Sequence, residues 1–102
     1  MEMVRKMNIC REVLGIVLAE LKTKSYQELH GLANGITALT KKFNGKKFAV
    51  EIEVRIENDG LLKIAVECSR DCFILGFFGI QQFFSVRPNG VVEDITGEEY
   101  YA

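Results

Sequence analysis

The fold of this 102-residue chain is decided by the stretch KFAVEIEVRIENDGLLKIAVEC, residues 47–68. In each half of the stretch, one set of alternate positions is wholly apolar. A period of two is typical of β-strands that bury one face and expose the other. The apolar positions are Val50, Ile52, Val54 and Ile56 in the first strand, and Leu62, Ile64, Val66 and Cys68 in the second.

The loop between these two strands follows from parity. A two-residue loop, Asp59-Gly60, would place Ile56 opposite Lys63 and set apolar against charged residues along the whole ladder. A loop of residues 58–60 instead places Ile56 opposite Leu62. It also puts Gly60 at the left-handed bulge position, which only glycine fills cheaply. We therefore expect the three-residue loop.

The same parity argument predicts the next connection at residues 69–71. Val66 then faces Ile74 and Leu62 faces Phe78 on the inner side of the sheet. Further on, residues 87–90 have the sequence RPNG, with proline second and glycine fourth, which is typical of a type I turn before a last strand over residues 91–95.

The N-terminal third of the chain predicts helices. Apolar residues recur at helical spacing from Ile9 to Leu21, after Asn8 as a cap, so a first helix should run to about Lys22. Ser25 and Glu28 form a capping-box pattern that starts a short second helix. Residues 36–43 are ambiguous between a helical turn and a strand, and the Asn-Gly pair that follows them favours a strand.

These elements define the fold class. Helices come first and hairpin-linked strands follow, which predicts an α+β fold with one or two N-terminal helices packed on a 4–5-stranded antiparallel β-meander. We expect one domain over residues 1–102, with flexible ends at 1–7 and 97–102.

Charge is divided between the two halves of the chain. Residues 1–47 carry nine Lys/Arg and four Glu, whereas residues 48–102 carry four Lys/Arg and ten Asp/Glu. The two halves should attract each other within the fold. Four lysines near residues 44–45 could contact phosphate, but the acidic strand beside them argues against a nucleic-acid partner.

Cysteine usage and hydropathy indicate a cytoplasmic protein. Three cysteines cannot form a closed disulfide framework, and no secretory signal pattern is visible. The most apolar stretch, residues 73–84, is too short to span a bilayer as a helix and contains glycine and glutamine, so we expect no membrane association.

No catalytic motif is present. The one histidine, His30, stands in no recognisable catalytic pattern, which argues against an enzyme and against a cofactor. Cys10, Cys68, Cys72 and His30 could in principle surround zinc, but the C-x3-C spacing and the lack of a second pair argue against a metal site.

The informative segment for function is residues 73–84, which is apolar at both parities. The expected register sends Phe73, Leu75 and Phe77 to the outer face, where something must cover them. The cover could be another part of the chain, a protein partner, or a curved, cone-like sheet that wraps around an apolar pocket.

Two functional hypotheses follow. The first is a non-enzymatic protein-binding domain, of inhibitor or immunity type, that acts through Phe73, Leu75, Phe77 and Phe83 and forms a homodimer. The alternative is a small-molecule-binding protein or enzyme with an apolar pocket in a curved sheet, in which His30 is the general base. The residues that line this pocket are Phe73, Phe77, Phe83 and Tyr26.

Overall fold

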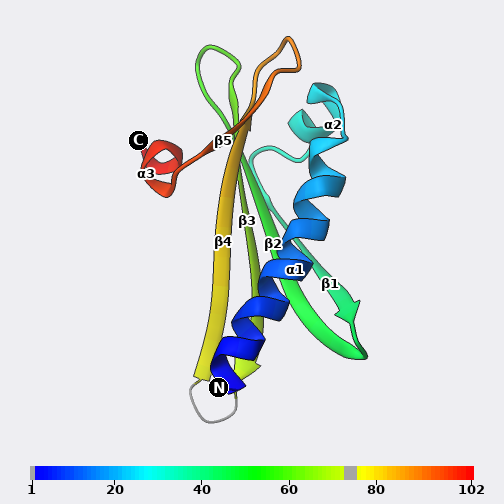
Figure 1. Ribbon diagram of the computed structural model, residues 1–102. Coiled ribbons are helices and arrows are strands. Elements are labelled where there is room, and N and C mark those ends of the chain that lie inside the picture. The colour runs from blue at the N-terminus through cyan, green and yellow to red at the C-terminus, as the bar shows by residue number, and fades with distance from the viewer. Residues whose placement is uncertain (1, 73–75) are drawn as a thin grey trace.

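The computed structural model describes residues 2–72 and 76–102 of the chain, and the side chains of residues 9–69 and 80–102 (Figure 1). Eight elements follow one another along the sequence. They are α1 (Glu2–Lys22), α2 (Tyr26–His30), β1 (Ile36–Phe43), β2 (Lys46–Ile56), β3 (Leu62–Cys72), β4 (Gly76–Val86), β5 (Val92–Ile95) and α3 (Gly97–Tyr101).

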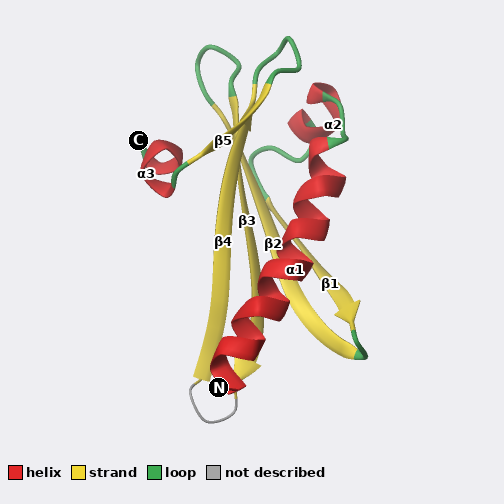
Figure 2. Cartoon of the chain, viewed as in Figure 1, coloured by secondary structure: helices red, strands yellow, loops and turns green. Residues whose placement is uncertain are grey.

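The five strands form one antiparallel sheet in the order β1-β2-β3-β4-β5, and α1 crosses one of its faces (Figure 2). The predicted α+β fold with a β-meander is therefore confirmed. α1 begins at Glu2 rather than at Ile9, so Asn8 lies within the helix and does not cap it.

The core lies between α1 and the inner face of the sheet. α1 rests mainly over β3 and β4, and its apolar stripe is buried there. The opposing strand residues are those of the expected inner parity, which is why they are almost fully excluded from water. The buried set includes Cys10, Val13, Leu14, Val17, Leu18 and Leu21 on α1, and Val50, Val54, Leu62, Ile64, Val66, Cys68 and Phe84 on the sheet.

The hairpin between β1 and β2 resolves the ambiguity of residues 36–43 in favour of a strand. Phe43 pairs with Lys46, and only Asn44 and Gly45 lie between them. Both turn residues have positive φ, 52° and 75°, as a type I′ turn requires.

The register between β2 and β3 is the predicted one. Ile56 pairs with Leu62 and Val54 pairs with Ile64. Gly60 has a φ of 85°, in the region that disfavours residues with a Cβ. At the end of β4, the amide of Gly90 donates to the carbonyl of Arg87 at 2.8 Å, which closes the expected turn.

The predicted connection at residues 69–71 is wrong. β3 continues to Cys72 and β4 begins at Gly76, so Val66 pairs with Gln82 instead of Ile74, and Leu62 with Val86 instead of Phe78. Any even shift of the register preserves parity, so the pattern could not choose among them. The observed register gives a longer ladder, which satisfies more backbone hydrogen-bonding groups.

The C-terminal residues contain a helix that the sequence analysis did not anticipate. Thr96 and Glu99 form a capping box, with the Glu99 amide donating to Thr96 Oγ1 at 3.1 Å and the Thr96 amide donating to Glu99 Oε1 at 3.0 Å. α3 brings Tyr100 to the outer face of the sheet, where only 1% of it is exposed. Flexibility of residues 1–7 and 97–102 stays a prediction.

Candidate functional site

The structure describes only some of the residues that were proposed as a partner-binding surface. Phe73 and Leu75 lie outside the described residues, and for Phe77 only the backbone is described, paired with Asp71. Phe83 pairs with Ala65 on the outer face. Its ring centroid lies 5.2 Å from that of Tyr100 and 6.1 Å from that of Tyr101, so α3 covers it.

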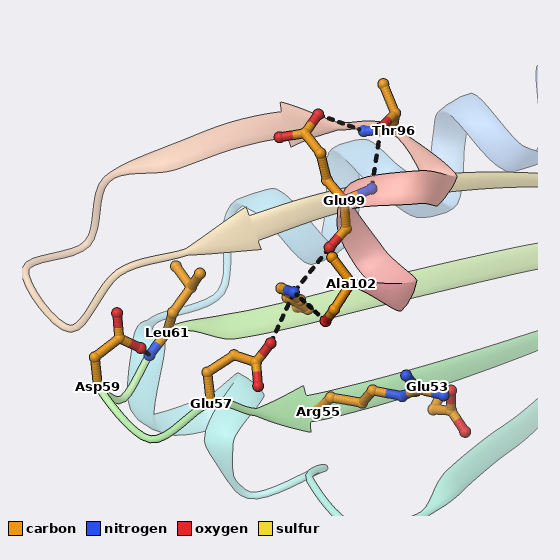
Figure 3. Close-up of polar contacts among 9 residues, drawn as sticks. Glu53, Arg55, Glu57, Asp59, Leu61, Thr96, Glu99 and Ala102 are labelled. Carbon is orange, nitrogen blue, oxygen red and sulfur yellow. Dashed lines mark hydrogen bonds and ion pairs between the residues drawn. The ribbon is translucent and has the colours of Figure 1, made fainter.

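Polar contacts hold α3 against the outer face of the sheet. The Tyr100 hydroxyl donates to Glu53, and the Arg55 guanidinium lies 4.7 Å from the centroid of the Tyr100 ring. Lys63 donates to the carbonyl of Glu99 at 2.8 Å and forms an ion pair with Glu57 at 2.7 Å (Figure 3). Burial and the neighbouring Glu53 raise the pKa of Tyr100, so the phenol stays protonated at neutral pH.

Tyr26 and His30 do lie together on α2, with ring centroids 5.9 Å apart. With Gln27 they line a hollow of about 290 Å³. The Tyr26 hydroxyl, however, donates to the carbonyl of Gly60 and anchors α2 to the β2–β3 loop. The ring neighbours of Phe83 are the tyrosines of α3, so the structure does not join Phe83 to these two residues in one pocket.

Of the residues considered for zinc, Cys10 and Cys68 lie together in the core, and His30 is apart from them. Both cysteines are completely buried, whereas His30 is exposed on α2, and the side chain of Cys72 lies outside the described ones. Burial raises the pKa of the Cys68 thiol to about 12, and Cys10 beside it adds to the effect. Within the part of the chain that the structure describes, no three His, Cys, Asp or Glu side chains gather in a metal-binding arrangement.

Three glutamates, Glu51, Glu53 and Glu67, lie near one another on the outer face of β2 and β3. Glu51 is directly opposite Glu67, which accepts a hydrogen bond from Gln81 at 2.8 Å. Glu53 lies 3.4 Å from the Arg55 side chain. These carboxylates border a shallow hollow of about 160 Å³. Arg55 partly balances their negative charge. The hollow is too shallow to enclose a substrate as an active site does.

A further hollow among the described residues is a mainly apolar groove between α1 and β1, with a volume of about 460 Å³. We call it the α1–β1 groove. α1 packs mainly over β3 and β4, so the apolar side chains between α1 and β1 are left open as the floor of the groove. Its lining consists of Val17, Glu20, Leu21 and Lys24 of α1, Glu28 of α2, Leu32 beyond it, Thr37, Leu39 and Lys41 of β1, and Ile52 of β2.

The rim of the α1–β1 groove is charged. Lys41 reaches across from β1 to Glu20 of α1, with an N–O distance of 3.3 Å. Glu28 accepts a hydrogen bond from the Ser25 amide, which lowers the pKa of its carboxyl, and the Ser25 side chain and the charge of Lys24 act in the same direction. The groove thus combines an apolar floor with two lysines and two glutamates at its border.

The outer edge of β1 carries unpaired backbone groups. In a two-residue hairpin the residues that flank the turn, here Phe43 and Lys46, form a hydrogen-bonded pair. Alternation along the strand then directs the N–H and C=O groups of every second residue away from β2. These residues are Ile36, Ala38, Thr40 and Lys42, and no strand within the described ranges pairs with them.

The sequence analysis missed this groove because it depends on where α1 crosses the sheet, which no periodicity reveals. The burial of β1 is visible only in the structure: exposed and half-buried residues alternate along the strand and none is fully buried, as in an edge strand.

Comparison of the chain with protein-family models, with curated proteins and with solved structures finds no match. None of the helices in the described part of the chain has the length and apolar character that a bilayer span requires. The groove and the edge of β1 are therefore interpreted from their own geometry.

Proposed function

We propose that this chain is a non-enzymatic protein-binding domain whose partner lies as an extended strand along the edge of β1. The observation that carries the proposal is the position of the α1–β1 groove, which opens directly beside the unpaired backbone groups of β1. A partner strand could use both features at once, because its backbone would pair with β1 while every second side chain entered the groove.

The energetics of such a complex are reasonable. Fully burying one Leu-sized side chain stabilises a complex by about 1.5–3 kcal/mol. Association itself costs about 4–15 kcal/mol, so a few apolar side chains and a row of backbone hydrogen bonds are both required. The groove volume of about 460 Å³ is within the range of about 300–1,000 Å³ found for binding pockets.

The apolar surface formed by Phe73, Leu75 and Phe77 stays a prediction, and α3 covers Phe83. The inhibitor or immunity-type role and the homodimer are likewise proposals. A homodimer in this geometry would pair two β1 edges across a two-fold axis, which sedimentation over a range of concentrations would detect. A cytoplasmic location is part of the same proposal and is supported by Cys10 and Cys68, which are buried and are not joined in a disulfide.

The experiment that tests the proposal removes one outward backbone donor. Thr40→Pro deletes an N–H that points away from β2, and proline is tolerated on an edge strand in that orientation. Thr40→Ala is the matched control, because it changes the side chain and keeps the N–H. Octapeptides selected from a random display library on the wild-type protein serve as probes.

We expect the selected peptides to bind Thr40→Pro at least about tenfold more weakly than wild type, and Thr40→Ala within about twofold. Circular dichroism verifies that both variants are folded. Equal binding to Thr40→Pro and to wild type, or a failure to select any peptide, would show that β1 does not accept a strand.

A small amphiphile is the second candidate occupant, because the groove has an apolar floor and lysines at its rim. A fatty acid such as dodecanoate would place its chain on the floor and its carboxylate near Lys24 or Lys41. Such a ligand needs no backbone donor, so Thr40→Pro would bind it as well as wild type does. Tight dodecanoate binding without peptide binding would favour this alternative.

A further inference from the structure

The two ends of the β1 edge differ in charge. Four lysines, Lys41, Lys42, Lys46 and Lys47, lie within residues 41–47, around the Asn44-Gly45 turn. The opposite end of β1 begins with Ile36, Thr37 and Ala38, which are uncharged. An extended segment beside β1 would therefore meet a strongly cationic surface at one end only.

Among the side chains that the structure describes, one acidic group forms an ion pair with Lys41, Lys42 or Lys46. Lys41 pairs with Glu20 at 3.3 Å, and both side chains are more than a third exposed, so water screens the pair. Lys42 and Lys46 are exposed, and no described side chain forms an ion pair with either. The charges of Lys42 and Lys46 are therefore available to a partner.

The register along the edge determines where each partner side chain would lie. Residues on the inner face of an added strand would lie beside Thr37 and Leu39 and enter the α1–β1 groove. Residues on its outer face would lie beside Ala38, Thr40 and Lys42. Directly opposite residues on neighbouring strands interact, and opposite charges there are favourable whereas like charges are not.

We infer that the partner segment of the proposed complex is an amphipathic strand of about the length of β1, eight residues, and that it carries acidic residues at the end beside the β1–β2 turn. Its alternate apolar residues match the groove floor, and its acidic end matches Lys41, Lys42 and Lys46. The inference rests on the proposed function and adds the chemistry of the partner. If the segment runs antiparallel to β1, the acidic end is its N-terminal end.

The test compares peptide selection on the wild-type protein and on the double variant Lys42→Glu/Lys46→Glu. Both lysines are exposed, so the fold should be retained, and circular dichroism verifies this. We expect octapeptides selected on wild type to be enriched in apolar residues at alternate positions and in Asp or Glu at one end. On the double variant, Lys or Arg should replace the acidic residues at that same end.

The affinities provide a second readout. Peptides selected on wild type should bind the double variant about tenfold more weakly, and the difference should shrink as salt is raised. Arg87→Glu is the matched control. It reverses an exposed positive charge at the β4–β5 turn, outside the α1–β1 groove, and it should leave the acidic preference beside the β1–β2 turn in place.

The outcomes separate this inference from the proposed function. If peptides bind wild type and lose affinity for Thr40→Pro, but show no acidic preference and no response to the double variant, the partner chemistry is wrong and strand addition stands. If Thr40→Pro has no effect, both the proposed function and this inference fail.

A dimer that Thr40→Pro disrupts would identify a second copy as the occupant and overturn the inference, since β1 itself carries no acidic residue. A ten-base oligothymidine that binds equally to wild type and Thr40→Pro, and not to the double variant, would overturn it too.

Discussion

Replacing Tyr100 with alanine should detach α3 from the outer face of the sheet. Tyr100 is 1% exposed, contacts the Phe83 ring, lies under the Arg55 guanidinium and donates its hydroxyl to Glu53. Burying an aromatic side chain removes about 150–250 Å² from water, which is worth about 4–6 kcal/mol at about 25 cal/mol per Å². Docking α3 costs conformational entropy, so part of this gain is offset.

We expect Tyr100→Ala to lower the free energy of unfolding by about 2–4 kcal/mol. Tyr100→Phe keeps the packing and loses only the hydrogen bond to a carboxylate, so it should cost about 1–2 kcal/mol. Tyr101→Ala is the control at a neighbouring position. Tyr101 is 60% exposed, so its loss should cost less than about 1 kcal/mol.

Urea unfolding followed by circular dichroism measures all three variants under identical conditions. If Tyr100→Ala is no more destabilising than Tyr101→Ala, α3 does not dock in solution. Phe83 would then be uncovered, and the outer face of β4 would again be a candidate partner surface.

Three further predictions concern the core and the turns. Cys10 and Cys68 should not react with a water-soluble thiol reagent in the native protein and should react on denaturation, because both are fully buried and the pKa of Cys68 is raised to about 12. Gly60→Val should cost about 1–3 kcal/mol, because φ is 85° and a Cβ there would lie 3.1 Å from Pro88 Cγ. Gly15→Ala, inside α1 with nothing near its Cβ position, should instead stabilise the protein by up to about 1 kcal/mol. The urea midpoint should therefore fall for Gly60→Val and rise for Gly15→Ala, and midpoints that do not move in opposite directions would refute these two predictions. Above pH 9 the unfolded state releases the Cys68 proton, whereas the folded state keeps it until about pH 12. The free energy of unfolding should therefore be unaffected by this thiol below pH 9, and its titration should lower that free energy by up to about 1.4 kcal/mol per pH unit toward pH 12. A free energy of unfolding that stays constant from pH 9 to 11 would contradict the burial of this thiol.

The parts of the fold that the sequence revealed are those set by local chemistry and by parity. The β2–β3 loop was predictable because only one register pairs Ile56 with Leu62 and gives Gly60 its positive φ. The β1–β2 turn was predictable from Asn44-Gly45 alone. The β3–β4 register was not, since shifting Val66 from Ile74 to Gln82 is an even shift that leaves every face assignment unchanged.

Two other features, α3 and the α1–β1 groove, were not predicted from the sequence, for different reasons. The capping box of Thr96 and Glu99 was present in the sequence, and it would have predicted a helix where a flexible end was expected. The α1–β1 groove had no such signal. Val17 and Leu21 belong to an ordinary apolar helix stripe, and only the path of α1 across the sheet leaves them open toward Leu39.

The proposed function depends most on the unpaired edge of β1, and amide hydrogen exchange measured by NMR tests this edge residue by residue. In the free protein, the amides of Leu39 and Lys41 should exchange slowly because they pair with β2, and those of Ala38, Thr40 and Lys42 should exchange quickly. Addition of a selected octapeptide should slow the second group and leave the first unchanged. Equal protection of all five amides in the free protein, or fast exchange at Thr40 with peptide bound, would contradict the account.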